Sequence, residues 1–244
     1  MKELIKIAGE YLYWSLIQRF AKKNAISADL KKASGNTSVI SDYRLRLRNN
    51  RAVYQHYGPG AGSKSAYTTV SEAAKVMSIR PLYGNVLYNL ASRYKPDTII
   101  ELGTAFGIST MYLALGNSAS KITTVEGNQQ LASIASENFR NYKLNNIQVR
   151  NLLFDDAVLT LQQELTDNSL VFIDGNHTYE ATTRYYNIFS KASILVFDDI
   201  RWSDEMRLAW KKILAGIPAG SAVDLFGMGI IFTKPGSEGC IQEI

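Results

Sequence analysis

From Asp97 onward, short apolar runs alternate with longer segments whose apolar residues recur at helical spacing. The runs predict strands over Thr98–Leu102, Ile122–Glu126, Ile147–Asn151, Leu170–Asp174 and Ile194–Asp198. The longer segments predict helices over residues 109–115, 129–142, 179–190 and 204–214. Buried strands that alternate with helices are typical of a parallel sheet with crossover helices. We therefore expect an α/β domain with helices on both faces of its sheet.

The end of the chain has a different pattern. Two apolar runs, residues 222–226 and 230–233, are separated only by Gly227-Met228-Gly229. A connection this short joins antiparallel strands, whereas a parallel pair needs a long crossover. The sequence therefore predicts an antiparallel C-terminal hairpin that completes a mostly parallel sheet of seven strands.

Residues 1–95 lack this alternation. Residues 1–24 predict a helix with one broad apolar face, which would pack on the body or on a second copy of the chain; a membrane-surface helix is the alternative. Residues 34–65 are polar, and three glycines among residues 58–62 indicate a mobile loop. We divide the chain into a mainly helical, basic appendage (1–95), serving as substrate lid or dimer contact, and a ligand-binding domain (96–244).

Charge is distributed unevenly along the chain. Residues 1–95 hold 16 Lys and Arg against 5 Asp and Glu, whereas residues 96–244 hold 11 against 17. The basic part is either a solvated face or a docking surface for an anion such as phosphate, nucleic acid or lipid head groups.

The numbers of cysteines and histidines and the lengths of the apolar stretches exclude several classes of protein. Cys240 is the one cysteine and His56 and His177 the two histidines, which excludes an intrachain disulfide and the usual zinc sites. No apolar stretch is long enough for a spanning helix, and the charged first residues do not resemble a signal peptide. We expect a cytoplasmic protein without a membrane span.

Acidic residues stand at the ends of the predicted strands, where open α/β sheets bind ligands. Gly103 and Gly107 follow the first strand and would let the backbone approach a ligand, while Glu101 favours a cationic ligand over a pyrophosphate. Glu126 ends the second strand, where a carboxylate can accept both hydroxyls of a ribose. These features predict a nucleoside ligand that carries a positive charge.

The segments Glu101-Leu-Gly-Thr-Ala-Phe-Gly107 and Phe172-Ile-Asp-Gly-Asn-His177, with Glu126 and the final hairpin, resemble the class I S-adenosylmethionine methyltransferases. Within that class they resemble the small-molecule O-methyltransferases, which include catechol, caffeoyl-CoA and antibiotic-sugar enzymes. The resemblance covers Asp97 to Lys234. It implies a Rossmann-like sheet with strand order 3-2-1-4-5-7-6 and S-adenosylmethionine as cofactor.

The resemblance also implies roles for residues. Gly103 and Gly107 would line the methionine part of the cofactor, Glu126 would hold the ribose, and the segment Phe154-Asp155-Asp156 would border the adenine. The full expected cofactor set is Glu101, Gly103, Thr104, Gly107, Glu126, Phe154, Asp155 and Asp174.

Three carboxylates at neighbouring strand ends, those of Asp174, Asp198 and Asp199, are hard oxygen ligands that suit Mg²⁺ or another divalent ion. In the resembling enzymes the matching positions hold a metal that lowers the pKa of the substrate hydroxyl. The alternative is an acidic rim that holds water or caps the following helices.

His177 follows Asp174 by three residues, where an imidazole could take a proton from a hydroxyl; Asp199 is its substitute as base. Aromatic and basic residues would form the wall of the acceptor pocket, unless the aromatic ones fill the core instead. The expected substrate residues are Tyr57, Lys64, Tyr179 and Trp202.

These observations predict an S-adenosylmethionine-dependent O-methyltransferase that acts on a hydroxyl of a small molecule. The basic appendage keeps methylation of RNA or protein open, although no Asn-Pro-Pro-Tyr type motif or known RNA-binding module occurs and we do not expect a nucleic-acid substrate. A non-catalytic cofactor-binding scaffold is a further alternative. A nicotinamide dehydrogenase is disfavoured because Ala105 stands where a third glycine would be.

Overall fold

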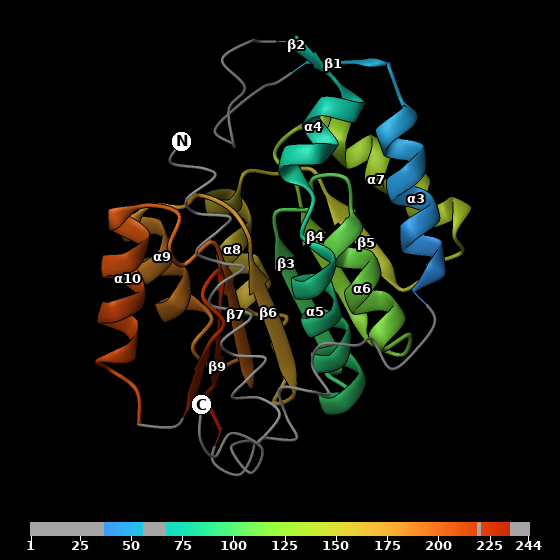
Figure 1. The fold of residues 1–244 in the computed structure, drawn as a ribbon. Coiled ribbons are helices and arrows are strands. Elements are labelled where there is room, and N and C mark those ends of the chain that lie inside the picture. Colours follow the sequence, from blue (N-terminus) through green and yellow to red (C-terminus); the bar gives the residue numbers. More distant parts are fainter. Residues whose placement is uncertain (1–36, 56–66, 219–220, 235–244) are drawn as a thin grey trace, which may run out of the picture.

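The computed structural model describes residues 37–55, 67–218 and 221–234, and its centre is a seven-stranded sheet. The strands are β3 (Thr98–Leu102), β4 (Lys121–Val125), β5 (Ile147–Arg150), β6 (Ser169–Ile173), β7 (Ile194–Asp198), β8 (Ala222–Asp224) and β9 (Met228–Phe232). Their order in the sheet is β5-β4-β3-β6-β7-β9-β8, and β9 is antiparallel to both of its neighbours. Counted from β3, this is 3-2-1-4-5-7-6, so the expected topology is confirmed (Figure 1).

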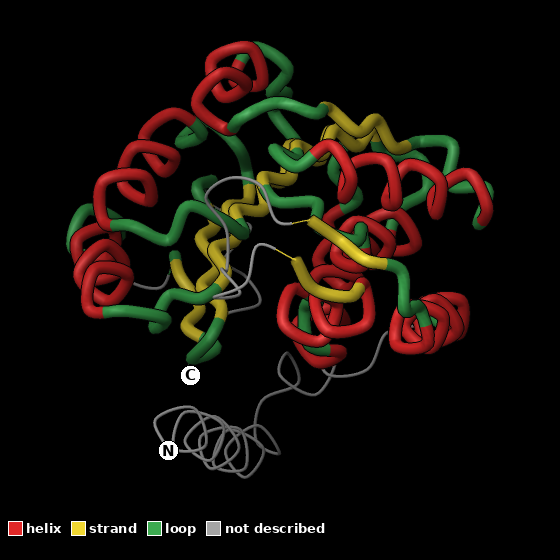
Figure 2. Tube along the Cα trace, turned by 90° about the horizontal axis from the view of Figure 1, so that it is seen from above, coloured by secondary structure: helices red, strands yellow, loops and turns green. Residues whose placement is uncertain are grey.

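Helices cover both faces of the sheet, as expected (Figures 1 and 2). One face carries α5 (Pro81–Tyr94), α6 (Ile108–Gly116) and α7 (Gln129–Asn141), and the other carries α8 (Phe154–Gln162), α9 (Tyr179–Ile188) and α10 (Asp204–Leu214). Successive side chains of a strand point to opposite faces. Accordingly, Ile99 belongs to the apolar cluster beneath α5 and α6, and Ile100 to the cluster beneath α9 and α10.

The parallel pairing brings the carboxyl ends of the central strands to one edge. Leu102, the last residue of β3, is paired with Val125 of β4 and with Ile173 of β6. Ile173 is paired in turn with Phe197 of β7. Glu126, Asp174 and Asp198, which follow Val125, Ile173 and Phe197, therefore lie at the same edge of the sheet.

The first described part of the chain corrects one expectation. Residues 38–49, inside the polar segment that indicated a loop, form helix α3 (Ser38–Asn49), which buries Ile40, Tyr43 and Leu47. Spacings of three and four residues place these side chains on one face, and the arginines between them hide that pattern. A short antiparallel pair, β1 (Val53–Gln55) and β2 (Tyr67–Thr69), and helix α4 (Val70–Met77) follow.

The described part of the appendage is packed on the sheet. Buried residues of α3, α4 and α5, such as Ile40, Val70 and Leu87, lie in one apolar cluster with Ile99 of β3. Residue 95 is therefore not a break in packing, and the role of the appendage as substrate lid or dimer contact stays a prediction. The helix expected over residues 1–24 lies outside the described ranges.

Two smaller differences concern secondary structure. Helix α8 was not expected, and strand β9 begins two residues earlier than the apolar pattern indicated.

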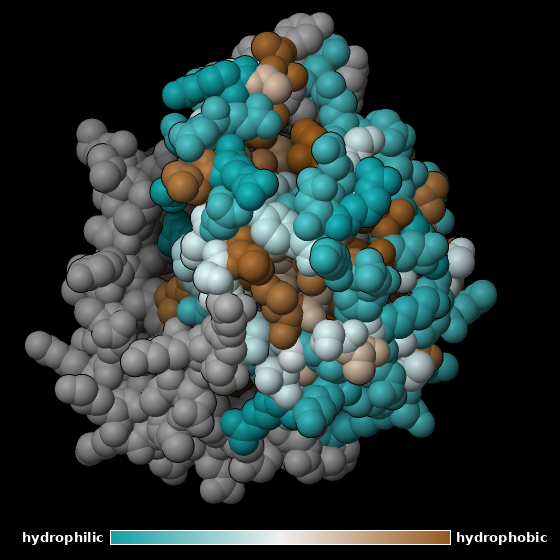
Figure 3. Space-filling view, turned by 90° about the vertical axis from the view of Figure 1, so that its right-hand side faces the viewer, coloured by the Kyte–Doolittle hydropathy of each residue, from teal (hydrophilic) through white to brown (hydrophobic). Residues whose placement is uncertain are grey.

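The surface of the described part is mostly polar on one side. The face at the right of Figure 1, which carries α3, is largely hydrophilic with apolar side chains only in patches (Figure 3). Among the described helices, none combines the length and hydropathy required to cross a membrane.

Candidate functional site

The turn between β3 and α6 is closely packed at its two glycines. Gly103 has φ +108°, and a Cβ there would lie 2.0 Å from the backbone oxygen of Asp174. Gly107 has φ +80°, and its Cβ would lie 2.5 Å from the ring of Phe139. Glycine is therefore required at both positions by backbone conformation and by neighbouring protein atoms, beyond the ligand approach that the sequence suggested. Helix α6 begins directly after Gly107, and no side chain caps it, so an anionic ligand group could accept its first N–H groups.

Glu101 lies beneath this turn and is completely buried. Its Oε2 accepts hydrogen bonds from the Thr110 hydroxyl (2.5 Å) and the Thr124 hydroxyl (2.6 Å), which joins α6 to β4. Thr104 strengthens the same junction, because its hydroxyl lies 2.6 Å from that of Thr124. Oε1 has no hydrogen-bond partner within the described ranges. The contacts make Glu101 and Thr104 supports of the turn, and their direct contact with cofactor stays a prediction.

Burial raises the pKa of Glu101 to about 7, although hydroxyl hydrogen bonds oppose the shift. The folded protein therefore retains a proton between about pH 4.5 and 7 that the unfolded chain has released, so stability should fall as pH rises through this window. The shift corresponds to about 3 kcal/mol in the free energy of unfolding. We expect Glu101→Gln, which mimics the protonated acid, to remove that part of the pH dependence in urea unfolding. Exposed Glu137→Gln is the control, and an unchanged profile in Glu101→Gln would contradict the assignment.

Glu126 connects the glycine turn to the start of α7. Its Oε2 accepts the N–H of Ala105, and its Oε1 accepts the N–H of Asn128, both at 2.8 Å. Asn128 caps α7 through hydrogen bonds from the N–H groups of the first turn. A carboxylate oxygen can accept more than one hydrogen bond, so these contacts are compatible with a ribose at Glu126, and that role stays a prediction.

Strand β1 reaches the same edge of the sheet. The Gln55 N–H donates to Oε1 of Gln130 at 3.0 Å, and Nδ2 of Asn128 donates to the Gln55 carbonyl at 3.3 Å. The appendage is thus in contact with the residues that adjoin Glu126. Tyr57, Lys64 and His56, which follow β1 in the sequence, lie outside the described ranges.

Acidic groups at the ends of β3, β4, β6 and β7 share one electrostatic environment. The pKa of Asp174 is raised well above its ordinary value by burial and then by the charges of Asp198, Asp199, Glu101 and Glu126, in that order. The charges of these acids therefore act on one another at this edge of the sheet, while their role as metal ligands stays a prediction. However, within residues 37–55, 67–218 and 221–234 no group of three or more His, Cys, Asp and Glu side chains is placed to hold a metal ion. The acids do not form a preformed metal centre, although a cation would relieve their repulsion.

His177 lies beside Asp174, with 3.8 Å between its Nε2 and Oδ1 of the carboxylate. The side chains of both residues are about one quarter exposed, so solvent and substrate can reach them. The N–H of Trp202 donates to the carbonyl of Asp199 at 2.8 Å, which holds Trp202 at the end of β7. Tyr179 and Trp202 are 40% and 54% exposed, so neither fills the core.

The predicted adenine segment starts α8. The ring of Phe154 lies against Gly175, where a Cβ would be 2.6 Å from the ring, so Phe154 adjoins the loop after β6. Asp155 instead forms an ion pair with Arg184 and accepts the hydroxyl of Tyr185 at 2.9 Å. The position of Phe154 is compatible with a place beside the adenine ring. The Asp155 carboxylate, in contrast, is already bound by Arg184 and Tyr185 of α9.

Comparisons with known proteins relate this chain to methyltransferases. A family model described as "Methyltransferase domain" matches residues 100–200. An uncharacterized protein R132 of Acanthamoeba polyphaga mimivirus is 30% identical over 57% of this chain and 70% of its own length. O-methyltransferase hkm8 of Aspergillus hancockii is 29% identical over 59% of this chain and 60% of its own. A tRNA (guanine-N(7)-)-methyltransferase of Mycoplasma mobile is 37% identical over 34% of this chain and 38% of its own length. The matches thus span 70%, 60% and 38% of the lengths of these three relatives.

Solved structures show the same fold. The O-methyltransferase from Bacillus cereus in complex with SAH has a TM-score of 0.58 and 21% identity, covering 82% of this chain and 92% of that chain. The O-methyltransferase TomG from Streptomyces achromogenes in complex with SAM has a TM-score of 0.55 and 19% identity, covering 65% and 82%.

The seven-stranded sheet and the glycine turn that follows β3 have the architecture of the methyltransferase α/β fold. With the family match and the relatives, they show that the chain belongs to the class I S-adenosylmethionine-dependent methyltransferases, as the resemblance implied. The O-methyltransferases among the relatives and solved structures agree with the predicted O-methyltransferase branch, whose substrate stays a prediction.

Proposed function

We propose that this protein transfers a methyl group from S-adenosylmethionine to a hydroxyl oxygen of a small molecule. The observation that carries the proposal is the pairing of His177 with Asp174 at the sheet edge, beside the ribose acid Glu126. A base at that place could activate a hydroxyl next to a bound cofactor. The O-methyltransferase names among the relatives and solved structures support the same reaction type.

The cofactor supplies an electrophilic methyl group when bound. Glu126 would hold its ribose, the N-terminal amides of α6 its methionine carboxylate, and Phe154 would border its adenine. The imidazole of His177 would take the proton from the acceptor hydroxyl, and the neighbouring Asp174 side chain would stabilise the imidazolium that forms. Tyr179 and Trp202 exclude water and orient the acceptor, together with Tyr57 and Lys64 of the appendage, which serves as lid.

We also propose that a divalent cation binds at the acidic edge of the sheet. The charge repulsion among Asp174, Asp198 and Asp199 is its only support, and the proton transfer to His177 does not require it. We expect Mg²⁺ to raise the methylation rate and EDTA to lower it. Asp198→Asn combined with Asp199→Asn should reduce this metal dependence while leaving the affinity for S-adenosylhomocysteine within about twofold. Rates that are equal with EDTA and with Mg²⁺ would remove the cation from the account.

One other function has specific support, and a second alternative stays open. The tRNA methyltransferase among the relatives and the excess of basic residues before residue 95 favour methylation of RNA as the second candidate. A cofactor-binding scaffold without turnover is the third. We place the protein in the cytoplasm because its single cysteine suits a reducing compartment.

The deciding experiment is incubation with methyl-labelled S-adenosylmethionine and three acceptor pools: catechols and other hydroxylated small molecules, tRNA, and protein extract. We expect label only in the first pool, and His177→Ala should lower that rate about 100-fold or more. Label in tRNA alone would favour the second candidate, whereas binding of cofactor without any labelled product would favour the scaffold.

A further inference from the structure

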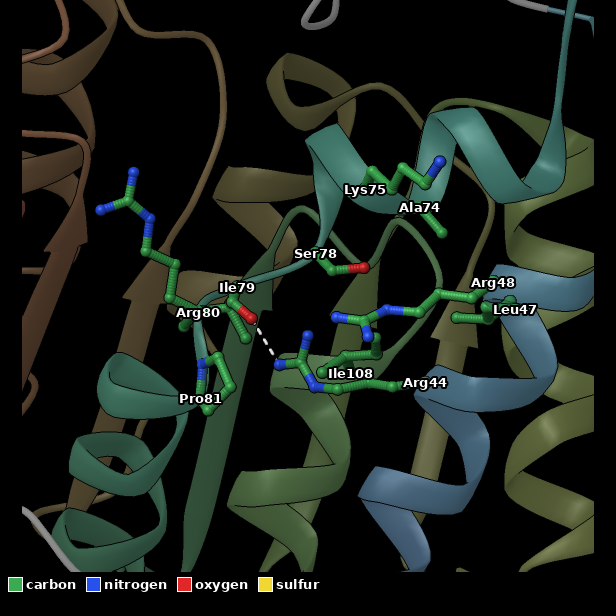
Figure 4. A pocket seen from close by; sticks show the side chains of 10 residues that line it. All are labelled: Arg44, Leu47, Arg48, Ala74, Lys75, Ser78, Ile79, Arg80, Pro81 and Ile108. Carbon is green, nitrogen blue, oxygen red and sulfur yellow. Dashed lines mark hydrogen bonds between the residues drawn. The ribbon is translucent and has the colours of Figure 1, made fainter. Parts of the chain in front are cut away.

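A basic cavity of about 170 Å³ lies between α3, the connection from α4 to α5, and the first turn of α6 (Figure 4). Four of the side chains that line it are cationic, namely Arg44, Arg48, Lys75 and Arg80. Within the described part of the chain, no acidic residue lines it. A space of this size exceeds the roughly 10–15 Å³ that one water molecule needs, so it has room for a small ligand group.

Arg44 and Arg48 supply the charge that faces this space. They are four residues apart on α3 and therefore lie on one face of the helix. Figure 4 shows both guanidinium groups extending from α3 toward Ser78 and Ile79, while the Arg80 side chain extends away from them. Lys75 lies above the pair on α4, where it interacts with Glu72.

The position of Arg44 is electrostatically unfavourable without an anion. Its Nη2 donates to the carbonyl of Ile79, but its Nε is buried and has no hydrogen-bond partner among the described residues. Burial lowers the pKa of Arg44, Tyr112 opposes that shift through its charge and a side-chain hydrogen bond, and the charge of Arg48 lowers the pKa by a smaller amount. A buried donor without a partner destabilises the fold, and two neighbouring like charges add to that effect.

An anion between the two guanidinium groups would satisfy the free donor and neutralise the repulsion. Arginine presents its N–H groups in a fork that matches the oxygens of phosphate, and pairs of this kind form charge-assisted hydrogen bonds. The Ser78 hydroxyl points toward the same space and can donate to a further oxygen (Figure 4). The cavity is partly open to solvent, and its volume of about 170 Å³ favours a terminal phosphate group over an extended polyanion.

We propose that this basic cavity binds the phosphate group of a small molecule, in the free form or as a monoester. The wall of the cavity includes Ile108, the first residue of α6, which follows Gly107 of the glycine turn. A phosphate ester bound in the cavity would therefore lie next to the start of α6. The binding site goes beyond the proposed methyl transfer, because its occupancy does not require that reaction.

The test is isothermal titration of the full chain at low salt with inorganic phosphate, with glucose 6-phosphate and, separately, with S-adenosylhomocysteine. We expect saturable binding of phosphate that Arg44→Gln and Arg48→Gln each weaken about tenfold or more. Arg46→Gln is the matched control, because Arg46 lies on the same helix but is 68% exposed and pairs with Asp42. It should change phosphate affinity by less than about twofold.

Urea unfolding shows whether each variant remains folded, and Arg48→Gln carries the test if Arg44→Gln does not fold. Tighter binding of glucose 6-phosphate than of phosphate identifies a monoester as the ligand, and equal binding identifies free phosphate. Absence of phosphate binding to folded protein, or equal weakening by Arg46→Gln, would overturn the proposal. Binding of tRNA that depends on Arg44 and Arg48 while phosphate and its ester do not bind would overturn it in favour of a nucleic-acid surface. If the unsubstituted protein binds phosphate but not S-adenosylhomocysteine, the result contradicts the proposed function and leaves the phosphate site standing.

Discussion

Gly103→Ala should lose both stability and cofactor affinity. The added Cβ would lie 2.0 Å from the backbone oxygen of Asp174, and φ of +108° disfavours any side chain. The end of β3 must then move relative to the end of β6, which costs about 2–4 kcal/mol in the free energy of unfolding. Because the same movement displaces the turn before α6, we expect S-adenosylhomocysteine to bind about tenfold more weakly or worse.

Urea unfolding and isothermal titration measure the two effects separately. Gly216→Ala is the matched control, because its Cβ would meet only the Ile213 oxygen at 3.5 Å, an ordinary contact after α10. That variant should retain both properties. Full cofactor affinity in Gly103→Ala would show that the turn does not form the binding site.

Glu126→Ala should weaken S-adenosylhomocysteine binding by roughly 1.5–3 kcal/mol, or about ten- to a hundredfold, if the ionised carboxylate holds the ribose. Part of any loss could come from the turn, since Glu126 also accepts the N–H groups of Ala105 and Asn128. A cofactor analogue without the 2′ and 3′ hydroxyls separates the two contributions. Removing the hydroxyls should weaken binding to the unsubstituted protein and have little further effect on Glu126→Ala.

Asp167→Ala is the control for this comparison. Asp167 is also acidic and pairs with Lys234, but it precedes β6 and therefore lies at the opposite end of the sheet from Glu126. It should leave cofactor affinity unchanged. An equal penalty for the missing hydroxyls in Glu126→Ala and in the unsubstituted protein would remove the ribose assignment.

The sheet could be predicted because its strands are buried on both faces. The strands β3 and β6 are buried at every position, so each appears as a short, mainly apolar run. The run of β6 is followed directly by Asp174, whereas that of β3 contains the buried Glu101. Glu126 and Asp174 could be placed at one edge for the same reason, since parallel strands end together. The order of the strands came from the resemblance, because local patterns do not specify which strands are neighbours.

Other features depend on contacts that a local pattern does not contain. Helix α3 was missed because only Ile40, Tyr43 and Leu47 are buried among polar neighbours, and the basic cavity beside it was missed as a consequence. The role of Gly103 against the Asp174 carbonyl joins positions far apart in the sequence. Helix α8 buries only Ala157, Val158 and Leu161, which is too few apolar positions for a clear helical period.

A crystal structure of the protein with S-adenosylhomocysteine would show where the cofactor binds. We expect the ligand to lie across the carboxyl ends of β3 and β4, with its ribose hydroxyls on the Glu126 carboxylate and its sulfur toward His177. A ligand bound elsewhere, or a ribose without contact to Glu126, would contradict this expectation.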